Sequence, residues 1–554
     1  MLTMGFGVDK PGNPSYTGCM SSATPPPAPA GESPRLWRKI GIASAIMMAS
    51  IFMSRVMGLA REMVIAGVAG ADAAVDAYRV AFIVPEILNH ILASGFLSVT
   101  FIPIFSRYLA EQSDEEGWRV FSLILTVFGA LLLGLIAVAE VYAPTLIGLL
   151  APGRTDPVFL AMAVRMTRII LPAQFFFFAG GLLMAVQFAR EQFFIPALAP
   201  LVYNLGIILG GVLLAARFGM EGFAWGVLGG ALMGNFAIQI WGARRSGMHF
   251  TLVWDWRHPD LWQYLRLTLP LMFGLTMMFS TEVFTKFFGS YLPPGSIAWI
   301  DYAMRIMLML VAFFGQAVGV ATYPFMARMA AEGRMADMNQ LLNDTLRYLC
   351  IVLPMGVLII VLREEIVSLL YMRGKFTRVD VLMTAPVLAC LMLGAVAFAT
   401  QTMVNRGFYA IQNTLLPAVY GTLAVIVSIP LYYFGMHWMG LKGVGLAVSV
   451  SAIVQVALLY AIWNRRSGNA GSGEVYRFFL KMALLSIPLA GLLMALRGWI
   501  VTMIDPHTFY GSVITTAAVG SVFVLLLIIA GYGFRIPEIT LLLQRLSRRL
   551  KRNG

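Results

Sequence analysis

The chain has 554 residues, of which 59% are hydrophobic and 12% are charged, and its mean hydropathy is +0.79. This composition is typical of a polytopic membrane protein and excludes an ordinary soluble fold. The net charge of +13 does not indicate a nucleic-acid partner, because the basic residues lie mostly in alternate loops and at the C-terminus, as the positive-inside rule describes. The three cysteines have no metal-ligand spacing, so neither a metal site nor a disulfide framework is predicted.

The first part of the chain, residues 1–36, is rich in Pro, Gly and Ser and is predicted to be a disordered cytoplasmic tail. After it, apolar windows of about 20 residues predict fourteen transmembrane helices in an all-α polytopic fold. The predicted spans are 40–68, 75–107, 119–150, 158–188, 194–216, 221–242, 265–290, 296–328, 345–371, 379–409, 413–434, 440–463, 476–501 and 511–533. Lys and Arg gather in the loops on the side of both termini, so both termini are predicted to be cytoplasmic.

An internal repeat relates the first spans to the later ones. A constant shift along the chain superposes the tetrapeptide at 244–247, Arg-Arg-Ser-Gly, on the identical tetrapeptide at 465–468. The same shift aligns Pro103 with Pro324 and Gly222 with Gly443. We therefore predict two six-helix bundles, 37–247 and 265–468, related by a parallel pseudo-twofold repeat, as in other transporters.

Three further segments complete the predicted organisation. Residues 248–264 contain Trp254, Trp256 and Trp262 among charged residues and predict an amphipathic interfacial linker. An aromatic anchor at the membrane interface explains the tryptophans equally well. Residues 469–535 hold two extra transmembrane helices, and residues 536–554 form a basic cytoplasmic tail.

The first span carries charges at membrane depth. Arg55, Arg61 and Glu62 occupy about a third of its helical circumference, with apolar residues on the remainder. Such charges are costly in lipid and normally face a bundle interior or a water-filled cavity. We therefore predict a polar cavity on this face, with pairing to carboxylates that hold helices together as the alternative for each arginine.

Two other charged positions have competing interpretations. Asp76 begins the second predicted span, where it could contact a substrate or cap the N-terminus of its own helix. Glu282 and Lys286 are four residues apart, so a helix-surface ion pair is predicted. A cation-coupling site at Glu282 is the alternative.

Several motifs together resemble MurJ-type (MviN) lipid II flippases of the multidrug/oligosaccharidyl-lipid/polysaccharide exporter superfamily. The resemblance covers roughly residues 40–465 and rests on these motifs: Ser54-Arg55-Val56-Met57-Gly58 with Arg61-Glu62, Asp76-Ala77, Phe101-Ile102-Pro103, Leu150-Ala151-Pro152-Gly153, Phe194-Ile195-Pro196 with Asn204, and Arg373-Gly374-Lys375-Phe376-Thr377. It implies an inner-membrane transporter that moves lipid II from the cytoplasmic to the periplasmic leaflet by alternating access, for cell-wall synthesis.

The resemblance also implies a substrate site. The family's cavity arginines fall on Arg55, Arg61 and Arg305, its acidic residue falls on Asp76, and Glu62 beside Arg61 joins them. The chain departs from the family pattern at Asn89-His90, where a basic pair is usual, and at Ser94 and Met304, where acidic residues are usual.

The motifs that power or catalyse reactions are missing. The sequence has no GxxxxGK[ST], HExxH or CxxC motif, so neither an enzyme nor a bound cofactor or metal is predicted. A drive from an ion gradient, the membrane potential or downstream removal of the substrate is expected. A flippase for another polyprenyl-diphosphate-linked oligosaccharide remains an alternative, as does a cation-coupled drug exporter.

Overall fold

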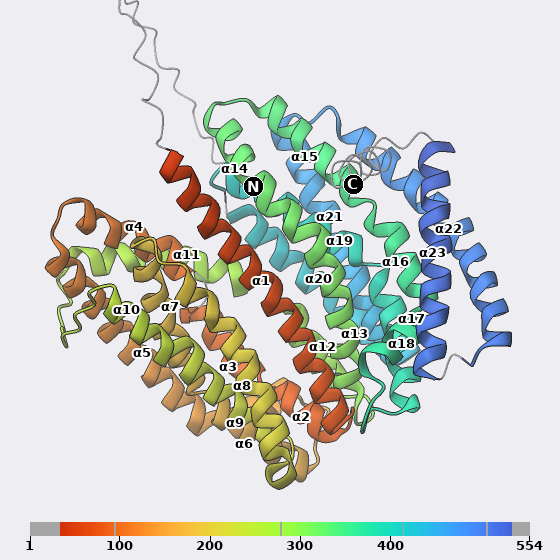
Figure 1. Ribbon diagram of the computed structural model, residues 1–554, viewed down its shortest axis with the longest axis horizontal. Helices are drawn as coiled ribbons and strands as arrows, with labels where there is room; N and C mark the ends of the chain where they lie inside the picture. Colours follow the sequence, from red (N-terminus) through yellow and green to blue (C-terminus); the bar gives the residue numbers. More distant parts are fainter. Residues whose placement is uncertain (1–33, 94–95, 277–279, 414, 506–507, 534–554) are drawn as a thin grey trace, which may run out of the picture. The chain divides into compact units, whose positions relative to one another are not determined.

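A computed structural model describes residues 34–93, 96–276, 280–413, 415–505 and 508–533 (Figure 1). These residues are helical with connecting turns, and no strand occurs among them. The chain divides into two compact units, one before Ile46 and one from Ile46 onward. The predicted tails at 1–36 and 536–554 lie outside the described residues, except that the first helix already begins at Pro34.

The helices of the first half run from the first span to the linker. Their bounds are α1 (Pro34–Ala69), α2 (Ala73–Ala81), α3 (Ile83–Leu88), η1 (Asn89–Ala93), α4 (Phe96–Ala110), α5 (Asp114–Leu150), α6 (Pro157–Ile170), α7 (Ala173–Ala189), α8 (Phe194–Phe218), α9 (Glu221–Gly230), η2 (Ala231–Ala237) and α10 (Ile238–Arg245).

The second half and the C-terminal pair follow. Their bounds are α11 (Pro259–Thr276), α12 (Ser280–Gly289), α13 (Ser296–Val311), η3 (Ala312–Gln316), α14 (Ala317–Ala331), α15 (Met335–Leu349), α16 (Val352–Val361), α17 (Arg363–Tyr371), α18 (Arg378–Met392), α19 (Ala395–Ala410), α20 (Leu415–Met439), α21 (Leu441–Ser467), α22 (Ser472–Met503) and α23 (Phe509–Gly533). The last two helices lie side by side (Figure 1).

The predicted repeat is confirmed in the bounds of the helices. The shift that carries position 244 onto position 465 also carries the bounds of α4 onto those of α14, and the bounds of α8 onto those of α20. Left-handed backbone recurs at the same offset, with φ of 54° at Gly219 and 57° at Gly440. It also recurs without glycine, with φ of 57° at both Glu191 and Gln412. The two halves therefore share both helices and turns, although few of their residues are identical.

The predicted spans coincide with helices or with runs of helices. Within the described residues, 10 helical stretches are long and apolar enough to cross a membrane, or 11 if the bent pair α18 and α19 forms one span. The predicted spans at 40–68, 75–107 and 265–290 fall on α1, α2–α4 and α11–α12, which do not meet this criterion. Charged residues interrupt the hydrophobicity of α1. The other two runs contain residues that lie outside the described part of the chain, 94–95 and 277–279. The number fourteen therefore stays a prediction.

Close helix packing in the first half depends on glycine. Gly210 of α8 lies so near α9 that a Cβ atom there would come within 2.4 Å of the Gly226 Cα atom, and one at Gly206 would come within 2.5 Å of the Gly230 Cα atom. Small residues that let two helix backbones approach closely are typical of helix packing in membranes. This contact sets the position of α8, which carries Asn204 into the site described below.

The segment between the halves is only partly an irregular linker. Residues 248–258 are outside the helices, but α11 begins at Pro259, so the last residues of the predicted 248–264 linker are helical. Trp254, Trp256 and Trp262 are 57%, 54% and 49% exposed, as an interfacial segment requires. Asp260 ties α11 to α4 through Arg107, at 2.7 Å, and through the hydroxyl of Tyr108.

Candidate functional site

A cavity of about 630 Å³ lies between α1, α7, α8 and α13. Its wall includes Arg55, Arg61 and Glu62 from α1, Asn204 from α8 and Arg305 from α13. We call this cavity the chamber. The structure thus brings together four of the five predicted substrate-binding residues, and it draws them from both halves of the sequence.

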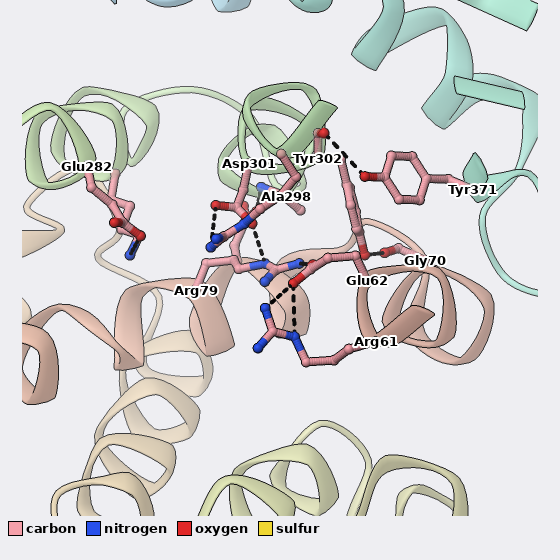
Figure 2. A network of polar contacts seen from close by, with 12 residues as sticks. Arg61, Glu62, Gly70, Arg79, Glu282, Ala298, Asp301, Tyr302 and Tyr371 are labelled. Atoms are coloured by element: carbon pink, nitrogen blue, oxygen red, sulfur yellow. Dashed lines mark hydrogen bonds and ion pairs between the residues drawn. The ribbon is translucent and has the colours of Figure 1, made fainter. Parts of the chain in front are cut away.

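Glu62, on the chamber wall, is the centre of a buried ion network (Figure 2). Its carboxylate accepts hydrogen bonds from Arg61 at 2.7 Å and from Arg79 of α2 at 2.5 Å. Arg61 also donates to the Asn204 Oδ1 atom at 3.2 Å. Since Glu62 is 2% exposed, desolvation would be costly without these partners. Glu62 therefore fixes the orientation of Arg61 at the edge of the chamber.

The network continues into α13. The Nε atom of Arg79 lies 3.1 Å from the Asp301 carboxylate, and Arg305 lies 3.5 Å from the other oxygen of the same carboxylate. The Arg79 guanidinium also lies over the Tyr302 ring, 5.4 Å from its centroid. Arg79 and Asp301 thus connect the first half of the chain to the second (Figure 2).

The chamber wall carries more basic than acidic side chains. Its lining holds three arginines, Arg55, Arg61 and Arg305, and one carboxylate, that of Glu62. Arg305 is 35% exposed, whereas Arg79 is 5% exposed. The positive charge is therefore accessible at the chamber surface, where guanidinium groups can pair with phosphate oxygens in a bidentate manner.

A smaller recess of about 150 Å³ lies beside Arg305 and includes Glu282, Lys286 and Asp301 in its lining. The predicted pair is present: the Lys286 Nζ atom lies 3.0 Å from Glu282 and 3.8 Å from Glu86. Lys286 is 4% exposed. Glu282 is thus engaged by a buried ammonium group.

Asp76 lies outside the chamber lining and is fully buried. Its carboxylate accepts hydrogen bonds from the backbone N–H groups of Gly295 and Ala298, each at 2.8 Å, and from Arg154 at 2.8 Å. Asp76 therefore caps the N-terminus of α13, in the other half of the protein. The expectation that it caps its own helix is wrong, because the N-cap of α2 is Asp72, whose side chain accepts from Ala74 and Val75.

Other contacts join the halves at the same end of the helices. The backbone N–H of Lys375 donates to the Gly67 carbonyl at 2.9 Å, and the Tyr302 hydroxyl donates to the Gly70 carbonyl at 2.9 Å (Figure 2). A Cβ atom at Gly374 would lie 2.0 Å from the Gly67 oxygen, so only glycine fits there. Together with the bonds of Asp76, these contacts form what we call the clasp.

Sequence reasoning missed Arg79 and Asp301 as members of the site. Arg79 is visible as a charge in the second predicted span, but its carboxylate partners, Glu62 and Asp301, lie on two other helices, one of them in the second half of the chain. Asp301 had one local signal, since it lies four residues before Arg305 on the same helix. Of the departures from the family pattern, His90 Nδ1 lies 2.7 Å from the Glu86 carbonyl oxygen, and Ser94 lies outside the described residues.

Comparisons with known proteins agree with this geometry. The family model described as lipid II flippase MurJ matches residues 65–518. The chain is 27% identical to the probable lipid II flippase MurJ of Bdellovibrio bacteriovorus, over 83% of this chain and 89% of that protein. It is also 27% identical to the lipid II flippase MurJ of Burkholderia cenocepacia, over 80% of this chain and 87% of that protein.

Solved structures match the fold. A lipid II flippase MurJ in an inward closed conformation superposes with a TM-score of 0.72 at 23% identity, covering 89% of this chain and 99% of that one. An inward-facing multidrug resistance MATE family transporter of the MOP superfamily gives 0.63 at 15% identity, covering 76% and 98%. With the family model matching well over half of its length, the chain belongs to the MurJ family of lipid II flippases, which are transporters and not enzymes.

Proposed function

We propose that this protein moves lipid II from the cytoplasmic to the periplasmic leaflet of the bacterial inner membrane. The observation that carries the proposal is the chamber, which exposes Arg55, Arg61 and Arg305 inside a membrane-spanning helical bundle. A diphosphate group cannot cross hydrocarbon without compensation of its charge. The guanidinium groups on the chamber wall can pair with the phosphate oxygens of such an anion.

The clasp supports alternating access as the mechanism. It joins loops on the predicted periplasmic side, opposite the two termini, where the loop of Arg373 and Lys375 is an exception to the distribution of Lys and Arg. With that end closed, lipid II would reach the arginines from the cytoplasmic leaflet. Separation of the two six-helix bundles at the clasp would then release it on the other side. The bundles at 37–247 and 265–468, with the linker between them, are the moving parts of this proposal.

Asp76 and Glu282 have separate roles in the proposed cycle. Asp76, which was predicted to bind substrate, would act by closing the clasp beneath the chamber, because its oxygens already bind α13 and Arg154. Glu282 remains the candidate for ion coupling. A coupling cation would compete there with Lys286, which lies 3.0 Å away.

The positive charge of the chamber also distinguishes between the alternative functions. A cation-coupled drug exporter would need carboxylates exposed to a cationic drug, whereas the chamber lining holds three arginines and one buried glutamate. A flippase for another polyprenyl-diphosphate-linked oligosaccharide would use the same arginines. Asn89 and His90, which replace the usual basic pair, are the positions that favour this second candidate.

A leaflet-specific assay of lipid II in depleted cells tests the function. Depletion should stop the appearance of lipid II on the periplasmic side, and continued appearance would reject the proposal. Among complementing variants, Arg305→Ala should fail and Arg305→Lys should complement only partly, because lysine keeps the charge but loses the planar fork. Arg328→Ala is the matched control, since that arginine is 80% exposed and pairs with the nearby Glu332.

A further inference from the structure

A third cavity, of about 210 Å³, lies in the second half between α12, α19, α20 and α21. Its lining contains no charged side chain among the described residues. The polar part of the wall consists of hydroxyl and amide groups, among them those of Gln401, Thr402, Asn405, Ser428, Ser451 and Gln455. We call it the neutral pocket.

One amide of the neutral pocket, that of Asn405, has a buried oxygen without a partner among the described residues. Asn405 is 8% exposed, and its Oδ1 atom accepts no hydrogen bond from the described residues. Buried polar atoms in folded proteins are almost always paired, so an unpaired one calls for an explanation. The hydroxyls of Ser428 and Ser451 donate to carbonyls of their own helices, those of Val425 and Ala447. Their oxygens can still accept.

The neutral pocket adjoins the positively charged site. Leu308 lines the chamber, the recess beside Arg305 and the neutral pocket, while Thr281 and Phe398 line both the recess and the neutral pocket. Leu308 comes three residues after Arg305 on α13, a rise of about 4.5 Å along the helix. A ligand whose phosphate lies at Arg305 could therefore extend into the neutral pocket.

We infer that the neutral pocket binds the uncharged, hydroxyl- and amide-bearing part of the lipid-linked saccharide while its diphosphate pairs with Arg305. The inference rests on the proposed function and assigns a second subsite to it. Amide and hydroxyl groups offer both donors and acceptors, which suits sugar hydroxyls and acetamido groups. A site built for such bonds discriminates strongly against a ligand that lacks the matching groups.

The size and chemistry of the pocket argue against a single bound ion. At about 30 Å³ per water, its volume corresponds to about seven waters, well beyond one ion. Its described lining also lacks a carboxylate to compensate the charge of a cation. A cation in the pocket is therefore an outcome that the test must be able to detect.

The test compares binding of two lipids to the full-length protein in nanodiscs. Lipid II carries the saccharide, whereas undecaprenyl diphosphate carries the same diphosphate without it. Asn405→Leu should weaken the binding of lipid II about tenfold, equal to about 1.4 kcal/mol, and leave undecaprenyl diphosphate unaffected. Its thermal stability should not fall, because the substitution removes a buried group that has no partner for its oxygen.

A pair of serine variants provides the control. Ser451→Ala, which changes the neutral pocket, should weaken lipid II binding selectively, whereas Ser521→Ala should change nothing. Both hydroxyls donate to the carbonyl four residues earlier, but Ser521 is exposed on α23. Arg305→Ala should weaken both lipids.

The outcomes separate the subsite from the function. If the wild-type protein binds neither lipid, the proposed function itself fails. If both lipids bind and Arg305→Ala weakens both, but the Asn405 and Ser451 variants weaken neither or weaken both equally, the subsite is overturned and the function stands. If these variants instead change the dependence of binding on Na⁺ for both lipids alike, the pocket holds a cation and the inference is wrong.

Discussion

Glu62 illustrates how one carboxylate organises the chamber. It holds Arg61 toward the cavity and neutralises Arg79, which is 5% exposed. Arg79 has a second carboxylate partner, Asp301, whereas Arg61 forms its ion pair with Glu62. Glu62 is therefore expected to contribute first to the stability of the fold, and to the chamber through its pairing with Arg61.

Replacement of Glu62 by alanine should lower the free energy of unfolding by about 3 kcal/mol, because it leaves the buried charge of Arg79 with only one acidic partner among the described residues. Thermal unfolding in detergent measures the change. Glu221→Ala is the control, since its pair with Arg165, which is 60% exposed, should contribute less than about 1 kcal/mol. Equal losses for the two variants would contradict the assignment.

At the scale of residues, the sequence indicates functional positions where a charged side chain lies in a segment predicted to cross the membrane. Arg55 and Arg61 could be predicted to face a cavity because charges at membrane depth normally do so, whereas Arg305 was assigned by the resemblance to the family. The partners could not be predicted. Whether Asp76 faces a substrate or a helix N-terminus depends on the position of α13, which belongs to the other half of the chain, and no local pattern reaches across that separation.

At the scale of helices, close backbone contact determines where α8 and α9 lie. Gly210 has no room for a side chain because the α9 backbone faces it, whereas Gly229 of α9 has no atom within 4 Å of a built Cβ position. The two glycines occur in the same packed pair of helices but in opposite surroundings. A comparison of alanine substitutions at the two positions therefore distinguishes the effect of packing from that of helix propensity.

Gly210→Ala should destabilise the protein by about 1–3 kcal/mol, since the added methyl forces the two helices apart. Gly229→Ala should be neutral or stabilising by up to about 1 kcal/mol, because alanine is the better helix former. Thermal unfolding of both variants in the same detergent gives the comparison. A loss of stability in Gly229→Ala as large as that in Gly210→Ala would refute the packing argument.

Much of the helical arrangement followed from the repeat. The shift between the two halves rested on a few Pro, Gly and Arg identities, and helix bounds and left-handed turns obey it. Helix breaks inside the apolar windows were harder to predict. In the second predicted span, 75–107, α2 ends at Ala81 and α3 begins at Ile83, and the π-helical turn η1 follows, although hydrophobicity alone predicts a continuous helix.

At the scale of the whole molecule, the clasp joins the two halves through a few bonds to backbone groups. Asp76 accepts three hydrogen bonds there, from Gly295, Ala298 and Arg154, and is fully buried. Helix capping by a carboxylate is modest in strength, which suits a closure that has to open in each cycle. The clasp is thus stable enough to close and weak enough to separate.

Asp76→Ala should shift the protein toward states that are open at the clasp. Spin labels at Thr155 and Tyr291, which are exposed near the point where Gly153 meets residues 290–291, report the separation of the halves by pulsed electron resonance. Longer distances should gain population in the variant. Asp72→Ala, which removes a cap within α2 only, should leave the distances unchanged, and a distribution unaffected by Asp76→Ala would rule out the clasp.

The repeat has a consequence for how a headgroup can lie in the chamber. The offset that superposes the helices does not superpose the charges, because Arg61 corresponds to Glu282, Arg305 to Val84 and Arg55 to Thr276. A symmetric backbone therefore surrounds an electrostatic field with two unlike ends. An elongated, asymmetric substrate is therefore expected to bind in a single orientation, with its anionic end always directed to the same wall.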